Sequence, residues 1–290
     1  MRIAIIGGAG NMGSWLVTHF LKKNHTLIVS DPKFEGVQSE EFETTTSNVV
    51  AVNNADLVLI SVPLIQTSSV IQEVFPHMKE NSVLCEISTL KSNVIEVLRN
   101  ESTNRIRTLC IHPLFGPGAS ALRKKYALIP IKELEGEMNL AKSLFPDSQF
   151  IVVEADEHDR IMALTLSLPY FTNMILGSVL KDENIPLIEQ LTGTTFAIQF
   201  MLTGSIMSHT SAFHLSLHKE NNHSMEILQK LKSGIEEALS LLANDVDEFK
   251  RSYNNLKSRL EEHLDLEEKY QEMYRLLEVM EKKKGVELNT

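Results

Sequence analysis

Residues 1–13 read MRIAIIGGAGNMG, and this stretch decides the fold class. A short apolar run, Ile3–Ile6, leads directly into a turn in which Gly8, Gly10 and Gly13 have the spacing of a dinucleotide-binding fingerprint. The amphipathic stretch Met12–Lys23 follows, so the glycines stand between a predicted buried strand and a predicted helix. The sequence therefore predicts that the chain opens with a nucleotide-binding strand–turn–helix unit.

Each glycine of this turn has a distinct predicted task. Gly8 allows the tight turn, Gly10 lets the backbone approach a pyrophosphate, and Gly13 lets the helix pack closely on the strand. Asn11 and Met12 open the helix, whose N-terminus offers unpaired N–H groups and a partial positive charge to phosphates. We expect these five residues to bind the cofactor.

An acidic residue completes the predicted nucleotide site. Asp31 ends the second predicted strand, about twenty residues after the turn, where a carboxylate accepts hydrogen bonds from an adenosine ribose. A 2′-phosphate would meet a like charge there, so Asp31 favours NAD over NADP. Lys33 lies two residues further and is able to neutralise such a phosphate. NAD is the expected cofactor, and NADP stays open.

The chain up to residue 153 alternates short apolar strands with helical patterns. Continuous apolar strands that alternate with helices predict a mostly parallel sheet covered on both faces, a doubly wound α/β fold of the Rossmann type. The predicted strands are Ile3–Ile6, Leu27–Ser30, Leu57–Val62, Ser82–Ile87, Arg107–Ile111, Ala127–Ile131 and Phe150–Val153.

The pattern becomes helical after Val153, and no proline follows Pro186. A long apolar helix is expected from Asp156 as its cap, with a kink at Pro169. Apolar residues then step by three and four from 228 to 260, which predicts one long helix or two hairpinned helices. We expect a nucleotide domain over 1–154 and an all-helical substrate and dimerisation domain over 155–290, with the ligands between them.

Composition excludes several classes of protein. The chain has 290 residues and a net charge of −10, which argues against a nucleic-acid or anionic-membrane partner. Cys85 and Cys110 lie in apolar runs, as expected for reduced buried thiols rather than disulfides. With no predicted membrane span or signal peptide, a cytoplasmic location is expected.

A second motif, IHPLFGPG at residues 111–118, follows the predicted strand Arg107–Ile111. His112 therefore lies at the carboxyl end of a strand, where doubly wound sheets bind their ligands. A neutral imidazole at that place is suited to accept a substrate proton near physiological pH.

With these motifs in place, the chain resembles the prephenate/arogenate dehydrogenase family of tyrosine biosynthesis. The resemblance rests on GGAGNMG (7–13), EISTLKS (86–92), HPLFGP (112–117) and ADEHDRIMALTLSLPYF (155–171), and it covers most of the chain. It implies a Rossmann-type domain followed by a helical domain that forms a homodimer. It also implies NAD(P)-dependent oxidative decarboxylation of prephenate or arogenate to 4-hydroxyphenylpyruvate or tyrosine.

The resemblance also implies roles for particular residues. His112 matches the catalytic histidine, and Thr89 stands where the family has a serine that helps to place it. Lys91 and Lys124 resemble basic family positions near this cleft and are the expected substrate-binding lysines, with solvated surface charges as the alternative. His158, in the EHD element, is expected to orient the contact between the domains.

Two departures from the family pattern put substrate identity in doubt. The run Ser167–Tyr170 replaces a His-Leu-Pro-His run of the family, which places Tyr170 at a substrate-binding position. Phe196, with Ala197 as the other candidate, stands where the family has a carboxylate-binding Arg. The cluster Arg123–Lys125 is the most obvious substitute cation.

Alternative interpretations stay open. The chain fits another two-domain NAD(P)-dependent reductase of the pyrroline-carboxylate reductase or β-hydroxyacid dehydrogenase type, although neither needs HPLFGP. A non-catalytic nucleotide-binding sensor is a further alternative. No metal is expected, because no carboxylate cluster completes a site with the four histidines at 209, 214, 218 and 223.

Overall fold

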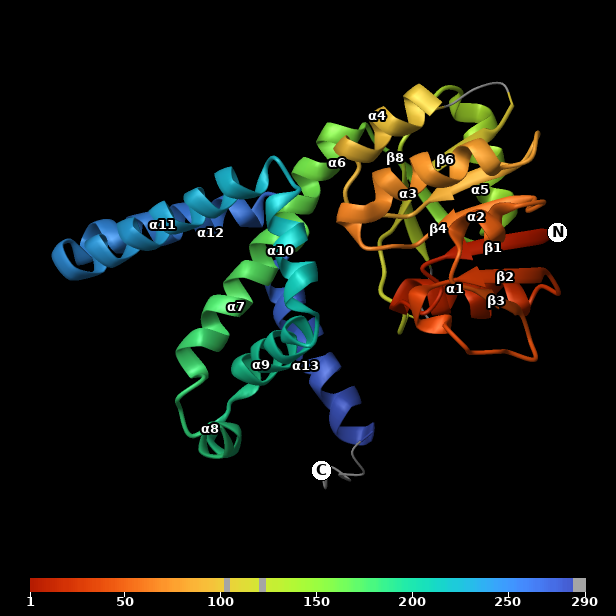
Figure 1. Cartoon of the computed structure of the whole chain (residues 1–290). Helices are drawn as coiled ribbons and strands as arrows, with labels where there is room; N and C mark the ends of the chain where they lie inside the picture. The colour runs from red at the N-terminus through yellow and green to blue at the C-terminus, as the bar shows by residue number, and fades with distance from the viewer. Residues whose placement is uncertain (102–104, 120–123, 284–290) are drawn as a thin grey trace. The chain divides into compact units, whose positions relative to one another are not determined.

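The computed structural model describes residues 1–101, 105–119 and 124–283 (Figure 1). The chain divides into two compact units, which are described separately. The first consists of Met1–Thr165 and Leu215–His223, and the second of Leu166–His214 and Ser224–Thr290. The two predicted domains, 1–154 and 155–290, have other bounds than these units and remain a prediction.

The first unit is built on a single sheet, and the part of the chain that is described contributes eight strands to it, in the order β3-β2-β1-β4-β5-β6-β7-β8. The strands are β1 (Arg2–Ile6), β2 (Thr26–Ser30), β3 (Glu43–Thr45), β4 (Leu57–Ile60), β5 (Val83–Glu86), β6 (Arg107–Pro113), β7 (Lys125–Leu128) and β8 (Gln149–Val152). Strands β1 to β6 pair in parallel, β7 is antiparallel to β6, and β8 is parallel to β7. The predicted α/β, mostly parallel, doubly wound fold is confirmed.

Strand β1 lies at the point where the strand order reverses, because β2 pairs with one of its edges and β4 with the other. In open α/β sheets, ligands bind beside the carboxyl ends of the strands at such a switch point. The glycine turn follows the carboxyl end of β1 directly. The topology therefore places the predicted nucleotide turn where the fold class binds its ligands.

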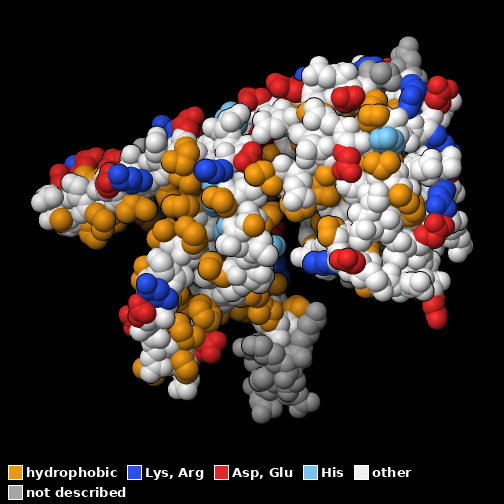
Figure 2. All heavy atoms as spheres, in the orientation of Figure 1, with side chains coloured by type: hydrophobic (Ala, Val, Ile, Leu, Met, Phe, Trp, Pro, Cys, Tyr) orange, Lys and Arg blue, Asp and Glu red, His pale blue; other side chains and the backbone are white. Residues whose placement is uncertain are grey.

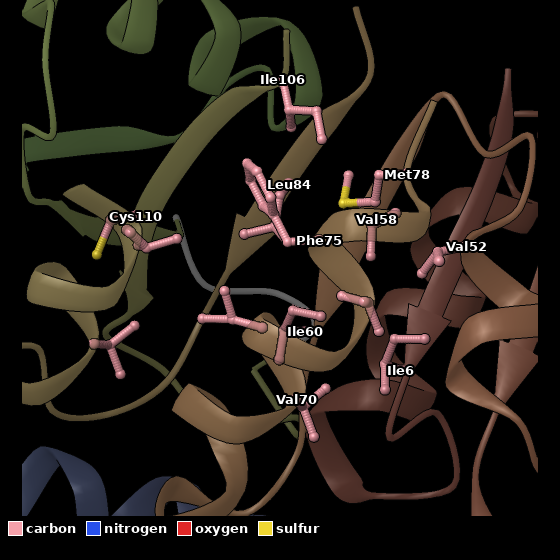
Figure 3. Packing of buried hydrophobic residues seen from close by; sticks show 14 of the residues in the cluster. Ile6, Val52, Val58, Ile60, Val70, Phe75, Met78, Leu84, Ile106 and Cys110 are labelled. Atoms are coloured by element: carbon pink, nitrogen blue, oxygen red, sulfur yellow. The ribbon is translucent and has the colours of Figure 1, made fainter. Parts of the chain in front are cut away.

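Helices cover both faces of this sheet. They are α1 (Asn11–Leu21), α2 (Asn48–Val52), α3 (Thr67–Val74), α4 (Ser92–Glu101), α5 (Leu134–Leu144) and α6 (Ala155–Met162), with 3₁₀ turns η1 (Pro32–Phe34), η2 (Leu64–Gln66) and η3 (Phe75–His77). Alternation along β1 divides its side chains between two cores, since successive strand residues point to opposite faces. Ile6 belongs to the core with Ile60, Val70 and Phe75 (Figure 3), and Ile5 packs in the core on the other face.

One strand was not predicted, and the ends of the others differ from the predicted ends by up to three residues. β3 was missed because it is a three-residue edge strand of polar residues, without the apolar run that identifies a buried strand. β6 continues to Pro113, two residues beyond its predicted end. Its first half pairs with β5 up to Cys110, and its last three residues pair with β7. His112 is therefore a strand residue and does not belong to the loop that follows.

The second unit is helical throughout its described residues. Its elements are α7 (Leu168–Leu180), α8 (Ile185–Leu191), α9 (Thr194–Met207), the first residues of α10 (Ser211–Lys219), α11 (Ser224–Asn244), α12 (Val246–Glu261) and α13 (Leu266–Lys283). Helix α7 packs against α9 and α11, and α13 packs against α9. The apolar stripe that begins at Leu228 lies on two helices, α11 and α12, which pack side by side as a hairpin (Figure 1).

The long apolar helix that was expected from Asp156 is interrupted. A π-helical turn, Ala163–Ser167, separates α6 from α7 just before Pro169, whose missing N–H prevents a continuous α-helical ladder. Glu154, and not Asp156, is the N-cap of α6.

By length and composition alone, Ala155–Leu180 is the one described stretch able to cross a membrane, a test that core helices of soluble proteins also pass.

Candidate active site

The glycine turn leaves no room for side chains. Gly7 has a φ of +83°, in the left-handed region that favours glycine. A Cβ on Gly13 would collide with the carbonyl oxygen of Gly7 and lie 2.7 Å from the Cα of Gly8. Gly10 is the N-cap of α1 and supplies no side-chain cap, so no protein oxygen from that position covers the N–H groups of Asn11 and Met12. This geometry fits a pyrophosphate.

Asp31 lies at the edge of the same turn. Its carboxylate accepts a hydrogen bond from the N–H of Ala9 at 3.1 Å and another from the N–H of Lys33 at 3.0 Å. The first bond ties the carboxyl end of β2 to the glycine turn, 22 residues away in sequence. The side chain is therefore held beside the place where the turn would receive a dinucleotide.

His112 occupies the antiparallel end of β6, opposite Ala127 of β7, and is only 7% exposed. Its Nδ1 lies 3.0 Å from Nε2 of His158, and the two rings meet edge to face. Burial lowers the pKa of His112 well below its ordinary value, and the charge of Lys91 lowers it further. The imidazole is therefore neutral near pH 7 and able to accept a proton.

His158 is oriented by a carboxylate. Its Nδ1 lies 2.8 Å from Oδ1 of Asp159, and both side chains are 2% exposed. Burial by itself would raise the pKa of Asp159, but hydrogen bonds from His158, Ser92 and Lys91 outweigh it and lower that pKa. His158 was expected to orient a contact between domains. In the structure it contacts His112 within the first unit, because α6 packs against α4.

The carboxylate of Asp159 also binds the start of α4. It accepts hydrogen bonds from the N–H of Lys91 at 2.9 Å and from the N–H of Ser92 at 2.8 Å. These N–H groups precede or open the helix and have no partner inside it. Asp159 therefore joins α4, α6 and the histidine pair through one side chain.

Lys91 does not take the predicted role of a substrate ligand. Its side chain is 0% exposed, and its ammonium donates to Glu86 at 2.6 Å and to the carbonyl oxygen of Ile111 at 2.7 Å. The same Glu86 accepts hydrogen bonds from Cys110 and Ser88. The prediction is corrected because a buried charge must be paired, and this ammonium is paired within the protein. Its bond to Ile111 instead fixes the backbone beside His112.

The other predicted site residues are placed as follows. Thr89 is half-buried in the loop between β5 and α4, and no hydrogen bond joins it to His112 among the residues the structure describes. The Lys124 ammonium lies 5.8 Å from the ring centre of Phe115. Arg123 lies outside the described residues.

Tyr170 and Phe196 belong to the second unit. The Tyr170 hydroxyl lies 3.3 Å from Nε2 of His209, and burial raises its pKa. Phe196 stacks on Phe200 at 5.7 Å within α9, and Ala197 is half-buried beside it. No three His, Cys, Asp or Glu side chains gather to hold a metal ion within the described ranges.

Sequence reasoning missed two functional side chains, Glu86 and Asp159, and the contact of His158 with His112. Each carried a signal. Glu86 is a charged residue at the end of an otherwise apolar strand, which requires a buried partner. Asp159 follows His158 directly, so an Asp–His pair stood in the EHD element.

The fold and the glycine turn together define a nucleotide-binding protein of the Rossmann type. One sheet carries a turn shaped for a pyrophosphate and, at the end of another strand, a buried histidine suited to proton transfer. Residues 18–148 match the family model described as prephenate dehydrogenase, nucleotide-binding domain. Residues 18–148 therefore carry a nucleotide-binding domain of the prephenate dehydrogenase type.

Two curated relatives are similar to this chain over most of its length. A probable arogenate/prephenate dehydrogenase of Methanocaldococcus jannaschii is 24% identical over 255 residues, which cover 84% of this chain and 57% of the relative. The T-protein of Haemophilus influenzae is 21% identical over 84% of this chain and 63% of its own. The chain thus spans less than two thirds of the length of either relative.

Two solved structures share the fold over nearly the whole chain. Synechocystis arogenate dehydrogenase has a TM-score of 0.64 at 14% identity and covers 91% of this chain and 100% of its own. Prephenate dehydrogenase from Aquifex aeolicus, in complex with hydroxyphenyl propionate and NAD⁺, has a TM-score of 0.68 at 16% identity, with coverages of 90% and 98%. The family is one of soluble enzymes, so we do not assign the apolar stretch Ala155–Leu180 as a membrane span.

Proposed function

We propose that this chain catalyses the NAD-dependent oxidative decarboxylation of prephenate or arogenate, giving 4-hydroxyphenylpyruvate or tyrosine in tyrosine biosynthesis. The observation that carries the proposal is the buried, neutral His112, held by His158 at the carboxyl end of a strand in the same sheet as the nucleotide turn. The match of residues 18–148 to the family model supports the same reaction, and the two solved structures share the fold that the reaction requires.

In this proposal His112 is the general base. Its ring accepts the proton of the substrate's ring hydroxyl while the hydrogen on the same carbon leaves as a hydride and the carboxylate leaves as CO2. Bound NAD⁺ supplies the hydride acceptor. Breaking the carbon–carboxylate bond gives its electrons to the ring, which becomes aromatic, and the proton held by His112 returns to the phenolate oxygen. Thr89 is proposed to hydrogen-bond the substrate close to this histidine.

The proposed cofactor is NAD, with NADP as the alternative. The supporting observation is the Asp31 carboxylate, which is fixed by the N–H groups of Ala9 and Lys33 beside the glycine turn. A carboxylate held in this way accepts hydrogen bonds from a ribose and repels a 2′-phosphate. Gly8, Gly10, Asn11, Met12 and Gly13 are proposed to bind the pyrophosphate.

We also propose a homodimer formed through the second unit, in the cytoplasm. Apolar side chains lie exposed along the α11–α12 hairpin and gather on its surface in Figure 2. Leu239 is 61% exposed and Leu256 is 58% exposed. Apolar surface of this extent is typical of an interaction site, and a second copy would cover it.

The resemblance assigns substrate-binding positions to three residues of the second unit, Tyr170, Phe196 and Ala197. Phe196 and Ala197 offer no charge to a substrate carboxylate, and Tyr170 offers a hydroxyl in place of a histidine. Lys124 is proposed to bind the substrate as one of the remaining cations. The same absence of charge at Phe196 supports the second candidate function, a nucleotide-binding sensor that no longer turns over substrate.

One assay tests these proposals together. Purified protein is given prephenate or arogenate with NAD or NADP, and reduced cofactor is followed by absorbance. We expect turnover with at least one substrate and preference for NAD. Tight NAD binding without turnover on either substrate would reject the dehydrogenase and favour the sensor, and preference for NADP would overturn the role given to Asp31.

A further inference from the structure

We propose that Asp159 and His158 are positioning residues that fix the tautomer of His112, so that Nε2 of His112 is the atom that accepts the proton. The inference rests on the proposed function for the identity of the substrate hydroxyl. The tautomer itself follows from contacts inside the first unit and is testable without any substrate.

The Asp159 carboxylate sets the direction of the hydrogen bonds that lead to His112. An ionised carboxylate only accepts hydrogen bonds. This one is held ionised by backbone N–H groups of Lys91 and Ser92, at 2.8–3.1 Å, which also prevent it from rotating. Nδ1 of His158, 2.8 Å from Oδ1, must therefore carry a hydrogen and donate it.

The second step is at His158. A neutral imidazole has one N–H, so with Nδ1 protonated, Nε2 of His158 is an acceptor. Its neighbour at 3.0 Å is Nδ1 of His112, which must then carry the hydrogen between the two rings. The lone pair of His112 is left on Nε2, for which the described residues provide no hydrogen-bond partner. Nε2 is therefore free to meet a substrate hydroxyl.

The charges around His112 maintain this state. Lys91, in the loop before α4, places its ammonium on the carbonyl oxygen of Ile111 and so disfavours a second positive charge on the neighbouring ring. Glu86 on β5 forms an ion pair with that ammonium at 2.6 Å and makes no hydrogen bond to His112 among the described residues. On α6, Asp159 faces His158 and is separated from His112 by that ring. No carboxylate bonds to His112 directly within the described part of the chain, so the tautomer depends on the His158 contact.

The sharpest test is Asp159→Asn. An amide keeps an oxygen for the N–H groups of Lys91 and Ser92, so the start of α4 remains capped. Its NH2 group now donates to Nδ1 of His158, which moves the His158 hydrogen to Nε2. The hydrogen bonds from residue 159 to His158 and from His158 to His112 then both reverse their direction. Nε2 of His112 then carries a hydrogen and cannot act as a base. Asp156→Asn is the matched control, because it makes the same change on α6 at a side chain that is 82% exposed.

The readout is the protonation of each ring nitrogen of His112, from long-range ¹H–¹⁵N correlation spectra of protein labelled with ¹⁵N-histidine, assigned with His112→Asn. Wild type and Asp156→Asn should both show Nδ1–H alone. Asp159→Asn should show Nε2–H and, in the assay above, a kcat lower by about 10²–10⁴-fold with KM nearly unchanged, the range that general base catalysis contributes.

Two results would overturn the inference. One is a wild-type His112 with its hydrogen on Nε2, which would also mean that His158 is doubly protonated. The other is an unchanged tautomer in Asp159→Asn. If that variant does not fold, His158→Phe serves instead, since it removes the acceptor and should leave a mixture of both His112 tautomers. A wild type without turnover on either substrate would reject the proposed function and leave the spectra to decide the inference.

Discussion

The first unit buries charged side chains, whereas the second buries none among its described residues. Glu86, Lys91, Glu137 and Asp159 are at most 8% exposed and all belong to the first unit. Buried polar residues of the second unit are uncharged, such as Asn173 at 3% exposed. The second unit instead exposes its apolar residues. The first unit thus pairs its buried charged groups within itself, whereas the second unit has an exposed apolar surface that we propose a partner covers.

Each buried carboxylate of the first unit has its hydrogen bonds satisfied. Glu86 accepts hydrogen bonds from Lys91, Cys110 and Ser88. Glu137 accepts hydrogen bonds from the backbone N–H groups of residues 131–133. An ion removed from water costs several kcal/mol unless such bonds offset the loss. The difference between the units teaches that the side chains with fixed hydrogen-bond partners are concentrated in the unit that contains the proposed general base.

The largest effect is expected at the proton acceptor of the first unit. His112→Asn removes the proposed general base and should lower kcat by about two to four orders of magnitude. NAD affinity, measured by fluorescence titration, should change little because the glycine turn lies on another strand. A variant with normal turnover would show that His112 is not the base.

The next effect contrasts ion pairs from the two units. Lys91→Met leaves Glu86 buried and unpaired, which should lower the free energy of unfolding by about 3–5 kcal/mol. Lys230→Met breaks the exposed Lys230–Glu226 pair of α11 and should cost about 0–1 kcal/mol. Urea unfolding monitored by circular dichroism compares the two. Equal losses of unfolding free energy in the two variants would show that the buried ion pair of the first unit is no more important for stability than the exposed pair of the second.

The exposed apolar surface of the second unit gives the third prediction. Leu239→Asp places a charge on the α11 face that we propose is covered by a second copy, and a desolvated charge there opposes association. Sedimentation should find wild type as a dimer and the variant shifted toward monomer by at least about tenfold in Kd, on the order of 1.4 kcal/mol. Lys250→Met, at a side chain of α12 that is 66% exposed, controls for the net-charge change because it also lowers the net charge by one. A monomeric wild type would reject the dimer.

The smallest effect concerns pH and the buried histidine. Because the folded pKa of His112 is depressed below its ordinary value of 6.5, the unfolded chain binds a proton first as pH falls through 6.5. Stability should therefore be full above about pH 6.5 and decline below it, by up to about 1.4 kcal/mol per pH unit. His112→Asn should lose less stability between pH 7 and 5.5 than wild type. Parallel losses would mean that His112 is not held neutral by the fold.

Much of the first unit could be predicted from sequence because its strands are continuous apolar runs separated by helices. The glycine turn and Asp31 were recognisable since their chemistry depends on spacing alone. Lys91 was misassigned because a sequence does not show whether a lysine faces water or a buried glutamate. The His112–His158 contact joins residues 46 apart, and only the packing of α6 brings them together.

The start of α4 also has a spectroscopic consequence. The amide hydrogen of Ser92 and the ring hydrogen of His158 bond to the same carboxylate, 2.8 Å away in each case. When that carboxylate takes up a proton or exchanges its partners, the Ser92 amide resonance must move with it. One backbone amide, far simpler to observe than an imidazole nitrogen, thus reports continuously on the state of the base during ligand titrations.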